Sequence, residues 1–221
     1  MKRLEDCTLY GILDFGYVAP ADALRVGEKM LTGGVEVVQL RAKDASLETI
    51  EALGAELLGI TEPAGVPLII NDHPQLVPAI GAQGAHVGQE DLAVADARWR
   101  AGRSLSGEVP APTIGQSTHS IAQALAAQEA GADYIGFGPL FPTPTKPGRP
   151  AIGLGEIARV HELLRLPIFV IGGIKRENLE AVLDAGARRV VIVSGILQAG
   201  DIVSYCREVR ARLQDRPKPK S

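Results

Sequence analysis

Short apolar runs alternate with amphipathic segments along nearly the whole chain. The runs are rich in Val, Ile and Leu and are almost continuous, which is typical of strands in a parallel sheet whose two faces are both covered. This pattern predicts strands at 8–13, 35–41, 67–72, 84–87, 113–118, 133–138, 167–172 and 189–194.

The segments between these runs carry apolar residues at helical spacing. Four of the strands follow a glycine that ends the preceding helix, at Gly34, Gly65, Gly131 and Gly186. Glycine at that position adopts the left-handed conformation that ends a helix and turns the chain into the next strand. Helices are therefore expected at 20–32, 46–64, 73–80, 93–100, 120–130, 154–164, 175–185 and 201–213.

Repetition of this strand–helix unit predicts an α/β fold, a single-domain (β/α)8 TIM barrel over residues 1–213. An open doubly wound sheet is the alternative, but no G-x-G-x-x-G follows the first strand to mark a dinucleotide site. Residues 100–112 fit either a long loop or an insertion. Residues 214–221 are basic and broken by proline, and we expect them to form a disordered tail.

Composition narrows the class of protein. With 46% hydrophobic and 22% charged residues, the chain can bury one large core. No apolar run approaches the roughly 18 residues of a membrane helix, and the net charge of −3 argues against a nucleic-acid surface. Cys7 and Cys206 lack motif spacing and are interpreted as reduced thiols of a cytoplasmic protein, although the sequence leaves a bridge between them open. It also leaves open a homo-oligomer.

Polar residues gather where the predicted strands end, which is where barrel enzymes place their catalytic groups. After the second strand, alternation puts Gln39, Arg41 and Lys43 on one face, so that an amide and two cations line the barrel mouth. Two neighbouring cations repel each other, and a bound anion would explain them. Solvated charges at a strand end are the alternative.

Two carboxylates follow neighbouring strands, at Asp72 and Asp91. Paired carboxylates without a His or Cys cluster suit a hard cation, most simply Mg²⁺ shared with a substrate phosphate. A helix-capping role is the alternative for Asp72. His86, on the strand between them, is interpreted as a hydrogen-bonded residue of the barrel wall.

The last four strand ends carry hydroxyls and glycines. Ser117 is predicted to point into the mouth, and without an acid–base triad it is a hydrogen-bonding residue rather than a nucleophile. Prolines at 139, 142 and 144 stiffen the loop that carries Thr143, Thr145 and Lys146, a combination that suits an anionic ligand. Glycines after the seventh and eighth strands let backbone amides approach a phosphate, with tight turns as the alternative.

Six motifs in this order resemble the thiamine phosphate synthase family over nearly the whole length of the chain. They are residues 39–43 (QLRAK), 71–72 (ND), 86–91 (HVGQED), 115–119 (GQSTH), 136–139 (GFGP) with 143–146 (TPTK), and 193–194 (VS). Any one of these motifs alone is weak, whereas the ordered set is specific.

The resemblance implies a transferase that joins 4-amino-2-methyl-5-(diphosphooxymethyl)pyrimidine to (carboxy)thiazole ethyl phosphate, giving thiamine phosphate and pyrophosphate. It implies Mg²⁺ as cofactor, held by Asp72 and Asp91. The implied contacts to the pyrimidine diphosphate are Gln39, Leu40, Arg41, Ala42, Lys43, Asn71, Ser117 and Lys146, and those to the thiazole phosphate are Thr143, Pro144, Thr145, Gly173, Val193 and Ser194.

The residues agree with that chemistry. Cleavage of a carbon–oxygen bond to diphosphate leaves a highly charged group, which Mg²⁺ and the cations Arg41, Lys43 and Lys146 can stabilise, with Ser117 as a hydrogen-bonding partner. An electron-rich pyrimidine suits a dissociative displacement. The alternatives are a thiazole tautomerase of the same barrel family and a non-catalytic sensor of phosphate ligands, neither of which needs the complete set of cations and paired carboxylates.

Overall fold

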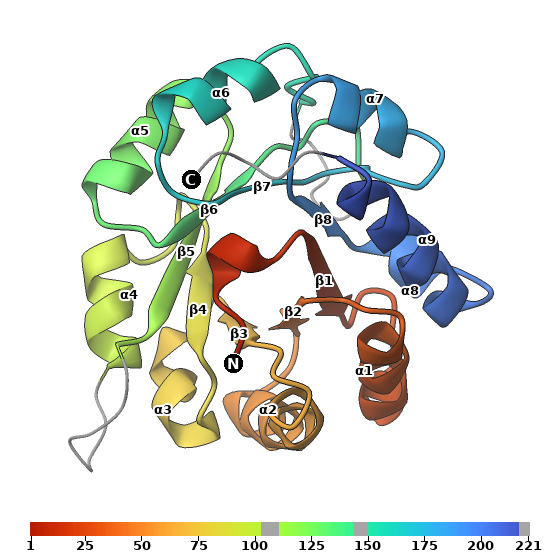
Figure 1. The fold of residues 1–221 in the computed structure, drawn as a ribbon. Coiled ribbons are helices and arrows are strands. Elements are labelled where there is room, and N and C mark those ends of the chain that lie inside the picture. The colour runs from red at the N-terminus through yellow and green to blue at the C-terminus, as the bar shows by residue number, and fades with distance from the viewer. Residues whose placement is uncertain (103–110, 144–149, 217–221) are drawn as a thin grey trace.

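The computed structural model describes residues 1–102, 111–143 and 150–216. Eight parallel strands pair in chain order and close into a barrel, and Figure 1 shows the helices arranged as a ring around it. The predicted (β/α)8 barrel is confirmed. The strands are β1 (Leu9–Asp14), β2 (Val37–Arg41), β3 (Leu68–Asn71), β4 (Gly84–Val87), β5 (Thr113–Thr118), β6 (Tyr134–Phe137), β7 (Ile168–Val170) and β8 (Val190–Ile192).

The helices lie between the strands as the pattern predicts. Ser46 and Ser120 cap two of them, each accepting a hydrogen bond from the backbone amide three residues later. The α-helices are α1 (Ala23–Thr32), α2 (Leu47–Thr61), α3 (Val77–Ile80), α4 (Val94–Ala101), α5 (Ile121–Glu129), α6 (Ile157–Leu163), α7 (Leu179–Asp184), α8 (Ser194–Leu197) and α9 (Ile202–Gln214), and short 3₁₀ turns occur at η1 (Leu4–Asp6), η2 (Pro20–Asp22) and η3 (Pro74–Leu76).

Three of the four glycines predicted to end helices, Gly34, Gly131 and Gly186, directly follow the C-cap residue of a helix, whereas α2 ends at Thr61 and Gly65 lies three residues beyond its C-cap Glu62. Gly34, Gly65, Gly131 and Gly186 have φ values of 91°, 66°, 83° and 107°. A side chain strains the backbone in this left-handed region, so glycine is the residue that turns the chain sharply from helix to strand.

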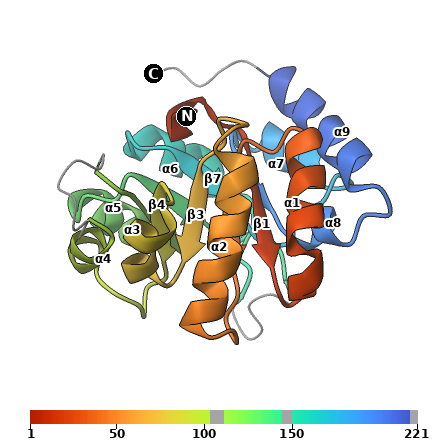
Figure 2. The ribbon, with the colours of Figure 1, turned by 90° about the horizontal axis from the view of Figure 1, so that it is seen from below.

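The two faces of the strands have different environments. One face packs against the helices in the larger core. The other fills the inside of the barrel with a smaller cluster, against which Leu4 of η1 packs. The N-terminal segment crosses the middle of the ring in Figure 1, and Figure 2 places the N-terminus opposite the end to which the strands point. One end of the barrel is thereby covered, and a cavity can open at the carboxyl ends of the strands.

Several predicted boundaries shift. Helix α7 begins at Leu179 and not near 175, and the one-turn helix α8 was not predicted because a single turn shows no periodicity. Helix α9 continues to Gln214, one residue into the segment expected to be a tail, and Arg216 contacts Glu180 and Asp184. Residues 103–110 and 217–221 lie outside the described part of the chain.

Cys7 and Cys206 are free, buried thiols, as expected. Burial raises the pKa of each thiol to about 12, so both stay protonated at neutral pH. Among the described residues, no helix is both long and apolar enough to span a bilayer.

Candidate active site

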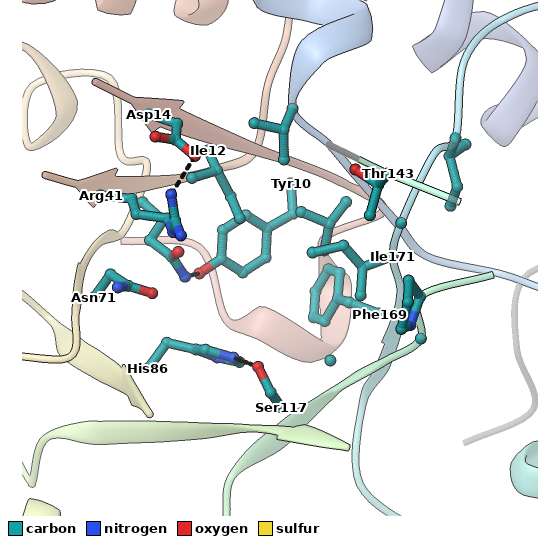
Figure 3. Close-up of a pocket in the computed structure, with 18 of the residues that line it drawn as sticks. Tyr10, Ile12, Asp14, Arg41, Asn71, His86, Ser117, Thr143, Phe169 and Ile171 are labelled. Atoms are coloured by element: carbon teal, nitrogen blue, oxygen red, sulfur yellow. Dashed lines mark hydrogen bonds and ion pairs between the residues drawn. The ribbon is translucent and has the colours of Figure 1, made fainter. Parts of the chain in front are cut away.

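A cavity opens at the carboxyl ends of the strands, and every strand contributes to its lining (Figure 3). Its floor is largely apolar and aromatic. The rings of Tyr10 and Phe169 meet edge to face with centroids 5.4 Å apart, and Ile12, Ile171 and Val191 complete the floor. Such a surface suits flat heteroaromatic rings.

Arg41 lies at the rim of this cavity and is paired with Asp14. Its Nη1 is 2.5 Å from Asp14 Oδ2, and the side chains are only 12% and 3% exposed. Arg41 was expected to have a bound anion as its partner, and Asp14 supplies a counter-charge that this expectation did not include. Asp14 was missed, although it ends the first strand and pairs in register with Arg41 on the second.

Asp72 and Asp91 lie close together, as expected from neighbouring strands. Burial, and then the negative charge of Asp91, raise the pKa of Asp72, while nearby Lys43 opposes this shift. The Asp91 carboxylate accepts a 2.7 Å hydrogen bond from the backbone amide of Gly88, which orients it. No side-chain cap was found at the start of η3 or α3, so a capping role for Asp72 gains no support.

Asp72 and Asp91 offer carboxylate oxygens, which are the type of ligand that Mg²⁺ prefers. In the described ranges, no group of three or more His, Cys, Asp or Glu side chains could hold a metal by itself. Mg²⁺ does not need one, because it is commonly held by one or two carboxylates, with waters and substrate phosphate oxygens completing its octahedron. Asp72 and Asp91 could hold such an ion together with waters and a phosphate ligand.

A chain of hydrogen bonds runs beneath the polar rim. His86 Nδ1 lies 3.1 Å from the Tyr134 hydroxyl and His86 Nε2 lies 3.0 Å from Ser117 Oγ, so the wall histidine is hydrogen-bonded as predicted. Tyr134 in turn lies 3.1 Å from the Tyr10 hydroxyl, to which Gln39 donates at 2.7 Å. Burial raises the pKa of both phenols, which therefore stay protonated.

Across the cavity from Arg41 and Asn71 lies Thr143, as Figure 3 shows. Backbone hydrogen bonds join the loops after β6 and β7, from Leu140 to Ile171 at 2.9 Å and from Phe141 to Gly172 at 3.0 Å. Gly173 has φ +67°, and a Cβ there would lie 2.7 Å from that of Phe141. Glycine therefore lets these two loops approach each other at the cavity wall.

The structure thus gathers most, but not all, of the predicted substrate-binding residues. The side chains of Leu40 and Ala42 face away from the cavity and are buried in the core, and the exposed Lys43 lies near Asp72 instead of lining the cavity. Pro144, Thr145 and Lys146 lie outside the described residues. The predicted substrate-binding residues that do line the cavity are Gln39, Arg41, Asn71, Ser117, Thr143, Gly173, Val193 and Ser194.

A cation and amides on one side, hydroxyls and glycines on the other and an aromatic floor between them are the features of a (β/α)8-barrel enzyme acting on small polar substrates. The sequence profile of one family, described as thiamine monophosphate synthase, matches residues 9–196. The chain belongs to this family, as its motifs suggested.

Named relatives agree with the assignment. The chain is 48% identical over 187 residues to a thiamine-phosphate synthase of Thermus thermophilus, covering 84% of this chain and 86% of that protein. It is 39% identical over 212 residues to the thiamine-phosphate synthase of Chloroflexus aurantiacus, covering 96% and 94%.

A solved structure extends the similarity to three dimensions. Thiamine phosphate pyrophosphorylase from Pyrococcus furiosus superposes with a TM-score of 0.84 at 27% identity, covering 96% of this chain and 98% of that one. The chain is accordingly a transferase of the thiamine-phosphate synthase type.

Proposed function

We propose that the chain transfers the pyrimidinylmethyl group of 4-amino-2-methyl-5-(diphosphooxymethyl)pyrimidine to the ring nitrogen of (carboxy)thiazole ethyl phosphate. The observation that carries this proposal is the division of the cavity into two polar sides over one aromatic floor. Two phosphorylated substrates need separate anion sites, and their two rings need an apolar surface between those sites.

The diphosphate is assigned to the side formed by β2 to β5. Arg41, Asn71 and Ser117 line the cavity there, and Arg41 is held in place by Asp14. Lys43 joins this group because it lies near Asp72, and Lys146 joins it because of the family motif. Fixed donors and charges aimed at a leaving group stabilise the charge that develops on it.

The reaction needs no protein nucleophile. The carbon–oxygen bond breaks with its electron pair going to the diphosphate, and the positive charge is left on the pyrimidinylmethyl group. The lone pair of the thiazole nitrogen then forms the new carbon–nitrogen bond. The protein's contribution is to position the rings and exclude water.

Mg²⁺ is the proposed cofactor, and Asp72 with Asp91 would hold it against the diphosphate. When bound, it would supply positive charge to the departing group, in the way metal ions commonly assist phosphate leaving groups. After burial, the negative charge of Asp91 is the next cause that raises the pKa of Asp72, and this proximity of two carboxylates supports a cation between them.

The thiazole phosphate is assigned to the opposite side, formed by the loops after β6, β7 and β8. Thr143, Gly173, Val193 and Ser194 line the cavity there. Pro144 and Thr145 continue the same sequence motif and are part of this proposal. Hydroxyls and exposed backbone amides are suitable partners for a phosphate that is bound but does not react.

Residues 1–213 are proposed to act as one catalytic domain in the cytoplasm, where the two free thiols would stay reduced.

Incubation with both substrates and Mg²⁺ tests the function directly. Pyrophosphate and thiamine phosphate should appear in equal amounts, and omission of either substrate should abolish both products. Isomerisation of the thiazole phosphate without release of pyrophosphate would contradict the proposal and would instead indicate a tautomerase.

A further inference from the structure

The hydrogen-bond chain beneath the cavity has a direction, which follows from the groups it contains. It begins at the amide nitrogen of Gln39, which is only 2% exposed and can donate but not accept. The Tyr10 oxygen therefore accepts, and its single proton is left for its other polar neighbour, the Tyr134 hydroxyl at 3.1 Å.

The next two groups, Tyr134 and His86, take their directions from this proton. Tyr134 accepts from Tyr10 and directs its own proton toward His86 Nδ1, 3.1 Å away. Nδ1 must then be the unprotonated nitrogen, and the ring carries its proton on Nε2. That proton is donated to Ser117 Oγ at 3.0 Å.

Ser117 ends the chain at the cavity wall, where Figure 3 shows its hydroxyl beside His86. Since its oxygen accepts from His86, its own proton is left to point toward a ligand. In the opposite direction, Ser117 would donate to His86 and present only lone pairs to the departing diphosphate, which would repel it.

The packing around this chain leaves little freedom. Tyr10 and Tyr134 are each 1% exposed, and both rings meet Phe169 edge to face at centroid distances of 5.4 and 5.8 Å. Gly115 lies beside them, and a Cβ at that position would collide with Tyr134 and lie 2.6 Å from His86 Nδ1. The absence of a side chain at 115 is what lets the phenol and the imidazole meet.

We propose that Tyr134, fixed by Tyr10 and Gln39, is a positioning residue that selects the tautomer of His86 and thereby makes the Ser117 hydroxyl a donor to the ligand. The inference deepens the proposed function, since it gives Ser117 a directed role toward the diphosphate. Tyr134 acts through two other side chains and does not itself touch the reacting atoms.

The tautomer can be read without substrate or catalysis. Nitrogen-15 NMR of histidine-labelled protein at neutral pH separates protonated from unprotonated ring nitrogens, and His86→Gln identifies the His86 signals. We expect protonated Nε2 and unprotonated Nδ1 in the wild type. The reverse assignment in the wild type would overturn the proposal whatever the variants do.

Tyr134→Phe removes the donor to Nδ1 while keeping the ring. It should raise the share of the Nδ1-protonated form, and Tyr10→Phe should do so more weakly. The matched control is Tyr205→Phe, which deletes a phenol that accepts from the backbone amide of Arg176 at 2.9 Å and is not among the residues that line the cavity. It should leave the His86 signals unchanged, and an unchanged His86 in Tyr134→Phe would contradict the proposal.

A double-mutant cycle tests whether Tyr134 acts through Ser117. Tyr134→Phe alone should lower kcat about tenfold, the effect expected of one misdirected hydrogen bond. In a Ser117→Ala background it should lower kcat no further, because the group it positions is gone. A merely structural role predicts equal losses in both backgrounds, which would overturn the proposal.

The two arms separate this inference from the function on which it rests. If the protein forms no thiamine phosphate, the proposed function fails while the NMR experiment still decides the tautomer. If turnover is observed but the tautomer is reversed, the function stands and the directed role of Ser117 falls.

Discussion

The guanidinium of Arg41 lies 2.5 Å from the carboxylate of Asp14, at positions that pair in register on adjacent strands. The orientation of the Asp14 carboxylate is itself fixed, because its Oδ1 accepts a 2.9 Å hydrogen bond from the Gly16 backbone amide. Arg41 therefore has a fixed orientation at the cavity rim before any ligand arrives. A charge fixed in advance does not have to reorganise during the reaction.

Asp14→Asn should weaken both the fold and the site. It leaves Arg41 buried without a counter-charge, and breaking such a pair from one side costs about 3 kcal/mol. We expect a loss of that size in the free energy of unfolding, measured by urea titration. We also expect kcat/KM for the pyrimidine diphosphate to fall on the order of tenfold to a hundredfold, because Arg41 loses its fixed position.

The control for this experiment is Asp22→Asn. Asp22 pairs with Arg25 at 2.8 Å on the surface, with the two side chains 50% and 59% exposed. Exposed pairs contribute about 1 kcal/mol or less, so this change should be close to neutral. Equal effects of the two substitutions would contradict the proposal that Asp14 stabilises the fold and orients Arg41.

Asp91→Asn should separate metal binding from stability. The pKa of Asp72 is raised by burial and by Asp91, so ionisation of Asp72 opposes folding, and the stability of the metal-free protein declines as pH rises through that pKa. Replacing Asp91 relieves the repulsion. In EDTA at neutral pH, we expect Tm to rise by about 1–2 °C, a modest value because solvent screens the pair.

With Mg²⁺ the same variant should behave in the opposite way. The increase in Tm that Mg²⁺ and pyrophosphate give the wild type should disappear, and turnover should fall on the order of a hundredfold. Glu51→Gln, which removes an exposed carboxylate from α2, should leave both measurements unchanged. Full activity of the wild type in EDTA would contradict the metal assignment.

The parts of this site that could be predicted from the sequence are those set by the alternation of side chains within a single strand. Gln39, Arg41 and Ser117, which line the cavity, were predicted because strand alternation alone sets the face on which a side chain lies. Tyr10 and Tyr134 were missed because they belong to β1 and β6, which are not neighbours, and meet only inside the closed barrel. The spacing of residues along the sequence does not reveal a contact between two such distant strands.

Lys43 was expected to line the barrel mouth together with Arg41, but it is not among the residues that line the cavity. Alternation was extended past Arg41, where β2 ends, although a side chain beyond a strand no longer obeys the two-residue period. Leu40 and Ala42 entered the site only through the family motif, and their side chains pack in the core. A motif therefore marks a segment of the site without telling which side chains face the ligand.

Glu36 should give the fold a defined dependence on acid. Its carboxylate accepts hydrogen bonds from the Thr8 amide at 2.8 Å and hydroxyl at 2.9 Å, and it contacts Lys2 and Arg210, which ties the two ends of the chain to β2. Burial by itself would raise the pKa of Glu36, but these hydrogen bonds outweigh it and lower that pKa.

A lowered pKa means that this stabilisation is present above the ordinary glutamate value of about 4.3 and is lost as pH falls through the lower native value. Glu36→Gln should therefore reduce the free energy of unfolding by about 2–4 kcal/mol at pH 7. Below about pH 4 the difference from the wild type should shrink. Urea titrations across this range, with Glu51→Gln as control, provide the measurement, and a constant difference would contradict the assignment.

Ser194→Ala and Asn71→Ala should affect the two substrates in opposite proportions. Ser194 lines the cavity on the side assigned to the thiazole phosphate, and Asn71 lines the side assigned to the diphosphate. A hydrogen bond to a charged group contributes about 1.5–3 kcal/mol, so Ser194→Ala should raise KM for the thiazole phosphate about tenfold or more. Its effect on KM for the pyrimidine diphosphate should be small, because that substrate is assigned to the other side of the aromatic floor.

Asn71→Ala should show the reverse order, and each variant thereby serves as the control for the other. Equal increases for both substrates in both variants would mean that the cavity holds one shared phosphate site and not two.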